Sequence, residues 1–334
     1  MADHLLLDAG SGGLASQRLI HDYFIQAFGN PILNVMDDAA LLEGFHGKMA
    51  MSTDSYTVTP LFFPGGSIGT LAVHGTVNDV SMLGARPRYL SCAVMLEEGL
   101  ELEKLKRVVW DMGEAARKAG VLIVTGDTKF VPRGGCEEIY KTTTGQGERL
   151  VPNPPSGHAA KPGDVILVSG SLGDHGLTIM AAREDLPFVS DVRSDSAPLN
   201  GLVEALLADC QVHVLRDPTR GGFATTLNEI AKQSKVGMRI RENDLPIHES
   251  VRSGCSFMGL DPLYLANEGK CLCFVPEAEA EKALQIMRSS PFGGEAAIVG
   301  CVQEDPSARV VLETAIGGER LLGMLEGAQL PRIC

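Results

Sequence analysis

Carboxylate side chains recur through the first half of the chain beside apolar segments, in a pattern that could hold a metal ion. They are Asp37, Asp38, Asp54, Asp79 and Asp127. We expect them in turns or at strand ends, where binding residues commonly sit on a rigid scaffold. Their oxygens suit Mg²⁺ and the phosphates that it carries. Each aspartate alone predicts only a turn, because Asp is favoured there for local hydrogen bonds. As a set, with Lys48 and Lys129 among them, they predict a site for a metal-bound nucleotide.

The known glycine-rich nucleotide loops are missing from the sequence. It contains no GxxxxGK[ST] segment, and GSLGDHG at 170–176 lacks the GxGxxG spacing, so a nucleotide site here would not be a P-loop. Three glycine pairs could present backbone N–H groups to phosphates. They are Gly12 and Gly13, Gly65 and Gly66, and Gly221 and Gly222. Glycine is also the ordinary turn residue, so each pair alone is weak evidence.

The chain ends in a cysteine, Cys334, at the end of the segment EGAQLPRIC. Few residues of this segment would pack it against a core, and we expect 323–334 to be a flexible tail with an exposed thiol. Fully extended, such a tail could reach about 35 to 40 Å and visit two sites in turn. In an arbitrary protein a terminal cysteine without a function would be the more common case.

The eight cysteines of the chain predict neither a disulfide framework nor a zinc site, because no CxxC pair is present. Cys271 and Cys273 lie in a segment typical of a strand. The alternation of side chains then places both on one face, which we expect to be buried in the core.

Charge and composition exclude several classes of protein. A net charge of −13 and a pI near 5.1 argue against a general binder of nucleic acid or anionic membranes, which would need clustered Lys and Arg. The N-terminus has no basic residue before Arg18 and only a short apolar segment, so it does not resemble a secretory signal. No apolar run is long enough to span a bilayer. We therefore expect a cytoplasmic protein.

The chain of 334 residues is long enough for two domains that position these residues. Residues 150–163 contain four prolines, and we place the boundary there, with domains at 1–150 and 160–322 before the tail. Apolar patterns predict strands at 48–52, 89–96, 121–125, 138–144 and 165–169, and helices at 101–118 and 222–233. This mixture predicts an α+β fold in which each domain is a sheet covered by helices.

Several short motifs, taken together and in order, resemble the HypE family of hydrogenase maturation proteins from end to end. They are GSGG at 10–13, TDSYTVTPLFFPGG at 53–66, TVNDV at 76–80, TGDTK at 125–129, SGSLGDHG at 169–176, RDPTRGG at 216–222, NEGK at 267–270 and PRIC at 331–334. The family is related to aminoimidazole ribonucleotide synthetase and selenophosphate synthetase. The resemblance implies a homodimer of two PurM-like α+β domains with ATP bound near the dimer interface.

The resemblance also implies a reaction, carbamoyl dehydration. The carbamoyltransferase HypF would load Cys334, and ATP with Mg²⁺ would drive conversion of the thiocarbamate into a thiocyanate. The cyano group would then pass to iron held by HypC and HypD and become the cyanide ligand of [NiFe] hydrogenase. Removing water from an amide requires its oxygen to become a leaving group, which phosphorylation achieves, and a base to take the amide proton.

Roles for individual residues follow from the same resemblance. Lys129 and Glu268 would contact the carbamoyl group on Cys334 with Asp79 nearby, and Glu268 is the leading candidate base. The nucleotide would be held by Lys48, Asp54, Asn78, Asp127, Thr128, Gly12 and Gly13. The metal would be held among the five aspartates named above. Whether Arg220 touches a ligand or only packs its turn is left open.

Two positions depart from the family pattern, and two alternative functions stay open. Ala9 stands where many members have His, and Met36 stands where related enzymes have Gly.

A selenophosphate synthetase or a thiamine-phosphate kinase is the first alternative. The former would carry a reactive residue near its N-terminus, whereas the first cysteine here is Cys92, and neither needs a terminal PRIC. A scaffold that only carries a group made elsewhere is the second alternative, and it would leave Glu268 and the aspartates unexplained.

Overall fold

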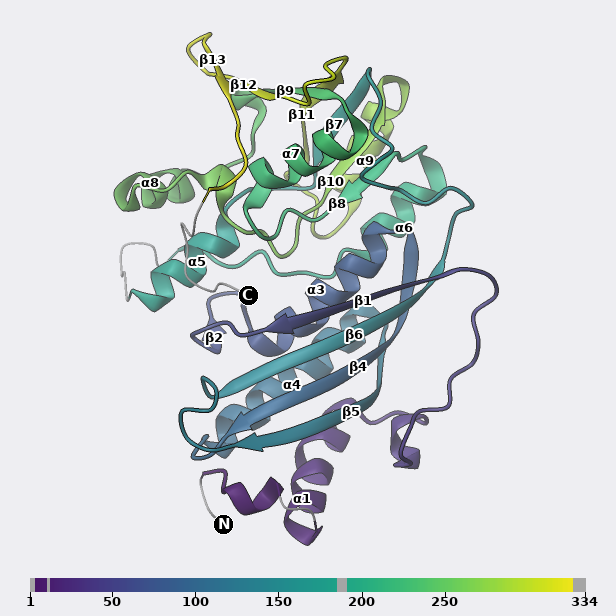
Figure 1. Cartoon of the computed structure of the whole chain (residues 1–334), viewed down its shortest axis with the longest axis vertical. Helices are drawn as coiled ribbons and strands as arrows, with labels where there is room; N and C mark the ends of the chain where they lie inside the picture. Colours follow the sequence, from purple (N-terminus) through teal and green to yellow (C-terminus); the bar gives the residue numbers. More distant parts are fainter. Residues whose placement is uncertain (1–3, 11–12, 185–190, 327–334) are drawn as a thin grey trace.

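The computed structural model describes residues 4–10, 13–184 and 191–326, which fold around two β-sheets (Figure 1). The first sheet has four strands in the order β1-β6-β4-β5. These strands are β1 (Met49–Tyr56), β4 (Ala85–Glu97), β5 (Leu122–Val131) and β6 (Ile139–Arg149). A small ribbon of β2 (Phe62–Phe63) and β3 (Gly66–Ser67) precedes the first long helix. The four predicted strands of this half are therefore confirmed, and each is longer than its sequence pattern indicated.

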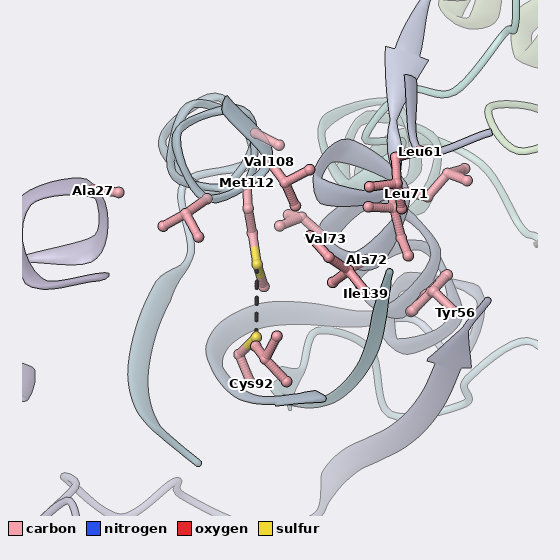
Figure 2. Close-up of a cluster of buried hydrophobic side chains, with 14 of the residues drawn as sticks. Ala27, Tyr56, Leu61, Leu71, Ala72, Val73, Cys92, Val108, Met112 and Ile139 are labelled. Atoms are coloured by element: carbon pink, nitrogen blue, oxygen red, sulfur yellow. Dashed lines mark hydrogen bonds between the residues drawn. The ribbon is translucent and has the colours of Figure 1, made fainter. Parts of the chain in front are cut away.

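Two helices, α3 (Ile68–Met82) and α4 (Leu102–Ala119), cover one face of the first sheet. Helix α4 confirms the predicted amphipathic segment. Helix α3 is apolar and buried on almost every side, because it lies between the sheet and the second half of the molecule. The two helices approach closely at Gly69, where an added Cβ would lie 2.2 Å from the carbonyl oxygen of Val108. Figure 2 shows Leu71 and Val73 of α3 together with Val108 and Met112 of α4 in this core.

The opposite face of the first sheet carries large apolar side chains that are exposed in the single chain. Met51 is 60% exposed, and Met49, Met95 and Leu122 are also exposed. Exposed apolar side chains that gather on one face in this way mark a candidate interaction surface.

A helical segment at the N-terminus packs beside β5, at the edge of the first sheet. It consists of η1 (Leu7–Gly10), α1 (Gly13–Leu19), a π-helical turn η2 (Ile20–Ile25), α2 (Gln26–Phe28) and η3 (Leu33–Val35). Phe24 and Ala27 are buried against the core of the first sheet. None of the described helices is both long and apolar enough to cross a membrane.

The second sheet has seven strands in the order β13-β12-β9-β11-β7-β10-β8. The strands are β7 (Asp164–Val168), β8 (Val214–Arg216), β9 (Gly237–Arg241), β10 (Leu272–Pro276), β11 (Ala297–Gln303), β12 (Val310–Glu313) and β13 (Glu319–Leu321). The helices are α5 (Asp174–Arg183), α6 (Asn200–Asp209), α7 (Gly222–Ser234), α8 (Glu249–Met258) and α9 (Ala280–Ser289), with short 3-10 turns η5 (Glu242–Asp244), η6 (Pro262–Tyr264) and η7 (Glu277–Glu279). Residues 150–163, which contain no strand or helix, join β6 to β7.

Alternation along β10 shows that helices cover both faces of the second sheet. Cys271 and Cys273 pack in one cluster with residues of α6 and α9, whereas Leu272 and Phe274 pack in another with residues of α7. The prediction that both cysteines share one buried face is confirmed. The helix predicted at 222–233 is also confirmed, as α7.

A lysine is buried in the first core without a carboxylate paired to it among the described residues. Lys141 of β6 is 1% exposed, and its Nζ lies 3.5 Å from Sδ of Met112. Burial lowers the pKa of Lys141, because the charged ammonium is poorly solvated there.

We predict that Lys141→Met stabilises the fold by about 1 to 3 kcal/mol at neutral pH, because it removes a buried polar group. The unfolded state binds this proton more tightly than the folded state, so the stability of the wild type should rise with pH toward 10.5, the ordinary pKa of the group. Urea denaturation between neutral and alkaline pH measures both effects. A destabilised Lys141→Met protein would contradict the prediction.

Candidate active site

The sequence-predicted aspartates are spread over regular elements rather than gathered in turns. Asp54 lies within β1, Asp79 within α3 and Asp127 within β5, so the expectation of turns or strand ends is wrong for these three. Only Asp37 and Asp38 lie in a loop, and both are exposed. The regular backbone geometry of the strands and the helix instead sets the direction of these side chains.

A cleft of about 1230 Å³ between the two halves of the molecule is lined by a group of ionisable side chains. The carboxylates lining it are Asp54, Asp79, Asp217 and Glu268, and Glu229 of α7 also lines it. The guanidinium groups are Arg216 and Arg220. Because its wall carries both anionic and cationic groups, the cleft can accept phosphates with their cations.

Asp54 and Asp79 are brought together from β1 and α3. The hydroxyl of Ser52 donates to Oδ2 of Asp79 at 2.6 Å, and the hydroxyl of Tyr56 lies 3.3 Å from Oδ2 of Asp54. Burial raises the pKa of Asp79, the bond from Ser52 lowers it, and the charge of Asp54 raises it again. Two carboxylates that repel each other in this way form a site that a cation would stabilise.

Glu268 is 4% exposed and its backbone is fixed from two directions. Its N–H donates to Oδ1 of Asp195 at 3.1 Å, and its carbonyl oxygen accepts from Nδ2 of Asn78 at 3.3 Å. Burial, followed by the charges of Asp195 and Asp217, raises the pKa of Glu268 well above its ordinary value. A carboxyl group with a raised pKa in a cleft is suited to proton transfer near neutral pH.

The side chain of Asn78 is occupied by protein contacts. Its Nδ2 also donates to the carbonyl oxygen of Ala197 at 3.0 Å, and its Oδ1 accepts from the N–H of Leu199 at 2.8 Å. The side chain is 1% exposed. In this structure Asn78 therefore positions Glu268 and the 195–199 segment, rather than offering a group to a nucleotide.

The fully buried side chain of Asn267 joins three loops around the cleft. Its Oδ1 accepts from the N–H of Gly173 at 2.8 Å, and its Nδ2 donates to the carbonyl oxygens of Pro218 at 3.1 Å and Leu265 at 3.0 Å. Gly222 completes this junction, because an added Cβ would lie 2.4 Å from the carbonyl oxygen of Leu265. Three of the sequence motifs, at 169–176, 216–222 and 267–270, thus meet at one amide.

Asp217 is a candidate site residue that the sequence reasoning missed. Burial and the charge of Asp79 raise the pKa of Asp217 to about 7. Its place in the motif RDPTRGG, immediately before Pro218, is the sequence feature that could have identified it. The carboxylate of Asp79, which raises its pKa, comes from a distant part of the chain. Arg220, left open from the sequence, lines the cleft, where its charge lowers the pKa of Asp79.

A second, smaller pocket of about 300 Å³ lies between β5 and the N-terminal helical segment. Its wall is mostly apolar, with Phe24 and Phe28 among its lining residues, and Asp37, Asp127 and Thr128 supply polar groups. The N–H of Thr128 donates to Oδ1 of Asp127 at 2.9 Å. The Lys129 ammonium, 2.9 Å from Asp127 Oδ2, is the main cause of a lowered Asp127 pKa.

The two pockets lie at opposite edges of the first sheet within one chain. β1 and β5 are its edge strands, so three interstrand steps, about 14 Å, separate them. The structure therefore does not bring Lys129 to Glu268, or Asp37 and Asp127 to Asp54 and Asp79. Over the described residues, no group of three His, Cys, Asp or Glu side chains is placed to hold a metal ion.

The remaining predicted residues are not gathered by these pockets. Lys48 is exposed just before β1, and Asp38 is exposed in the loop after η3. Gly13 begins α1, whereas Gly12 and the predicted acceptor Cys334 lie outside the described residues. Leu325, at the start of the tail, does line the large cleft.

Comparison with known proteins identifies close relatives over nearly the whole chain. Residues 36–148 match the N-terminal domain, and residues 161–313 the C-terminal domain, of AIR synthase related protein. The carbamoyl dehydratase HypE of Azotobacter vinelandii is 52% identical over 326 residues, covering 97% of this chain and 96% of that protein. The Escherichia coli carbamoyl dehydratase HypE is 44% identical over 337 residues, covering 99% of this chain and 100% of that protein.

Two solved structures show the same similarity in three dimensions. A crystal structure of hydrogenase maturation protein HypE in complex with ATP has a TM-score of 0.96 at 62% identity, covering 99% of this chain and 100% of that chain. A HypE chain in a crystal structure of a HypE–HypF complex has a TM-score of 0.81 at 50% identity, covering 92% of this chain and 99% of that chain.

The raised pKa of Asp217 predicts a pH-dependent stability. The folded state holds this proton more tightly than the unfolded state, so the free energy of unfolding should fall as pH rises from 3.8 toward about 7. Asp217→Asn removes this loss, and we expect it to raise the free energy of unfolding by on the order of 1 to 2 kcal/mol just above neutral pH.

Denaturant titrations over this pH range, without nucleotide, measure the effect. The control is Asp305→Asn, because Arg309 and Ser307 lower the pKa of Asp305 and that substitution should lower stability at neutral pH. If Asp217→Asn behaves as Asp305→Asn does, the raised pKa of Asp217 is wrong.

Proposed function

The chain belongs to the HypE family of carbamoyl dehydratases, and we propose that it uses ATP to convert an S-carbamoyl group on its own Cys334 into a thiocyanate. The product would supply the cyanide ligand for the iron of [NiFe] hydrogenase. The observation that carries this proposal is the cleft that contains both the buried Glu268 and the root of the tail at Leu325. The selenophosphate synthetase and thiamine-phosphate kinase alternatives are not adopted, because the relatives at 52% and 44% identity over nearly the whole chain are carbamoyl dehydratases.

The length of the tail supports a reaction on the same chain. Cys334 lies nine residue steps after Leu325, which span about 30 Å when the chain is extended. The tail could therefore fold back so that its thiol enters the cleft. It could equally extend away from the molecule to receive the carbamoyl group.

The first proposed step makes the amide oxygen a leaving group. The carbamoyl oxygen attacks the γ-phosphorus of ATP, the bond from that phosphorus to the β–γ bridging oxygen breaks, and ADP departs. One N–H proton leaves the carbamoyl nitrogen, giving an S-bound iminophosphate. Arg216 and Arg220 are placed to stabilise the charge on the transferred phosphoryl group, because their guanidinium groups line the same cleft.

The second proposed step forms the C≡N bond. The ionised carboxylate of Glu268 takes the remaining N–H proton, the carbon–oxygen bond breaks, and inorganic phosphate departs. The surroundings that raise the pKa of Glu268 make it a stronger base than an exposed glutamate. The sum is conversion of the thiocarbamate and ATP into thiocyanate, ADP, phosphate and one proton.

We propose that Mg²⁺ accompanies the nucleotide and that a second subunit completes the site. Mg²⁺ would neutralise phosphate charge during transfer. Asp54 and Asp79 would hold it from the cleft, together with Asp37 and Asp127 of the partner subunit. Lys48, Thr128, Gly12 and Gly13 stay candidates for nucleotide contacts, and Asp38 for the metal. The exposed apolar face with Met51 and Met95 is the surface that a homodimer would cover.

Two kinds of partner are proposed, and a solved complex of a relative supports the first. A HypE–HypF complex has been crystallised for a relative, and we propose that HypF loads Cys334 of this chain. A HypC–HypD complex that carries iron would then accept the cyano group.

Mass spectrometry tests the reaction. After incubation with HypF, carbamoyl phosphate and ATP, the C-terminal peptide should gain a carbamoyl group and then lose the mass of water. Glu268→Gln should keep the adduct, with water loss slowed about 100-fold or more because the base is missing. The exposed Glu281→Gln on α9 is the matched control and should behave as the wild type. Consumption of ATP with Cys334 unmodified, or an unchanged rate in Glu268→Gln, would contradict the proposal.

A mixed dimer tests the shared site. Lys129→Ala and Glu268→Gln should each inactivate the homodimer. If each site combines Glu268 of one subunit with Lys129 of the partner subunit, unfolding and refolding an equal mixture should restore about a quarter of wild-type activity. Half of those dimers would be mixed, with one intact site each. A site built within one subunit would give no recovery.

A further inference from the structure

The root of the tail, residues 322–325, lies along one face of helix α7. Nδ2 of Asn228 donates to the carbonyl oxygen of Leu322 at 2.7 Å, and the N–H of Leu325 donates to Oγ1 of Thr225 at 3.3 Å. Nζ of Lys232 lies 2.9 Å from Sδ of Met324. The three α7 residues have helical spacing of i, i+3 and i+7, which places them on one side of the helix.

The direction of this contact is set by the order of the partners. Leu322 meets Asn228, whereas Leu325 meets Thr225, one turn nearer the start of the helix. The chain therefore runs opposite to α7, toward Gly222, where the helix begins beside the cleft. In Figure 1 the yellow chain descends from β13 toward the first sheet in the same sense.

A second support comes from the segment that leads to Glu268. The hydroxyl of Tyr264 donates to the carbonyl oxygen of Gly323 at 3.0 Å, and Arg320 pairs with Asp261 at 2.9 Å. Asp261 also accepts from the N–H of Leu263 at 3.0 Å and so fixes the turn η6. Residues 261–268 thus contact the tail root near the start of this segment and include Glu268 at its end.

These contacts differ in how easily they can open. Asn228 is buried, and Leu322 is part of the core around α7, so this bond belongs to the fold. Tyr264 and Thr225 are only partly buried, and each contributes a single hydroxyl. Between Gly323 and Leu325, the described hydrogen bonds of the chain are these two hydroxyl contacts and the exposed lysine–methionine contact.

We propose that the hydroxyls of Tyr264 and Thr225 form a releasable tail anchor that aims the modified Cys334 at the cleft. Both are positioning residues for the dehydration step, and the inference rests on the function proposed above. A tethered group reacts at an effective concentration set by the length and freedom of its tether. When the anchor opens, the tether to Cys334 starts at Gly323 instead of Leu325, so it is longer and the effective concentration of the thiol at the cleft is lower.

The test compares the reaction on the protein's own tail with the reaction on a free peptide. Tyr264→Phe and Thr225→Val are loaded by HypF, isolated, and given ATP in a single turnover. We expect water loss to slow by up to about 1.5-fold, because lengthening the tether from nine to eleven residues lowers the effective concentration roughly as the −3/2 power of its length. Thr225→Ser keeps the hydroxyl and should restore the wild-type rate.

The free-peptide arm uses an S-carbamoylated peptide of residues 326–334 with Cys334→Ala protein. This peptide lacks the anchored residues, so the anchor substitutions should leave its rate of dehydration unchanged. Circular dichroism and thermal unfolding of each variant establish that the fold is kept.

The outcomes separate the anchor from the proposed function. If the wild type retains its carbamoyl adduct in the presence of ATP, the proposed function fails. If the wild type loses water and the two variants match it, the anchor is wrong. If the variants slow the free peptide as much as the tethered tail, the two hydroxyls act within the cleft, and the positioning role is overturned.

Discussion

The buried amide of Asn267 is the interaction on which the geometry of the cleft depends. Its side chain bonds to the loops at Gly173 and Pro218, so three loops from different parts of the second sheet share one junction. Breaking it would leave buried donors and acceptors without partners, which costs more than a hydrogen bond contributes. Glu268 follows directly in sequence and is fixed in turn by Asp195 and Asn78. The position of the candidate base is therefore determined by backbone contacts rather than by its own side chain.

The same cleft holds carboxylates that destabilise one another. Burial raises the pKa of Asp79, Asp217 and Glu268, and the neighbouring carboxylates raise it further. Without a ligand this arrangement costs stability at neutral pH. Binding of phosphate with its cation would relieve the repulsion and return Glu268 toward the ionised form that a base requires. The same buried carboxylates thus account both for the repulsion in the free cleft and for its proposed chemistry.

Sequence patterns predicted elements with one dominant face and failed where contacts are distant. The amphipathic period of α4 and the alternation along β10 are local, and both were predicted correctly. Helix α3 was missed because it is buried all round and has no polar period, so Asp79 was wrongly expected in a turn. Asp195 and Asp217 were missed because their partners lie far away in sequence. The division of the predicted aspartates between two edges of a sheet depends on strand order, which local patterns do not encode.

In the proposed reaction the carbamoyl oxygen leaves as part of inorganic phosphate, and the phosphoryl group is transferred in the cleft around Glu268. This can be measured by following ¹⁸O in a protein whose Cys334 carries an ¹⁸O-labelled carbamoyl group. After a single turnover with unlabelled ATP in unlabelled water, the account predicts one ¹⁸O atom in the released phosphate for each thiocyanate formed. Unlabelled phosphate together with labelled water would show that the oxygen departs without phosphorylation and would contradict the account.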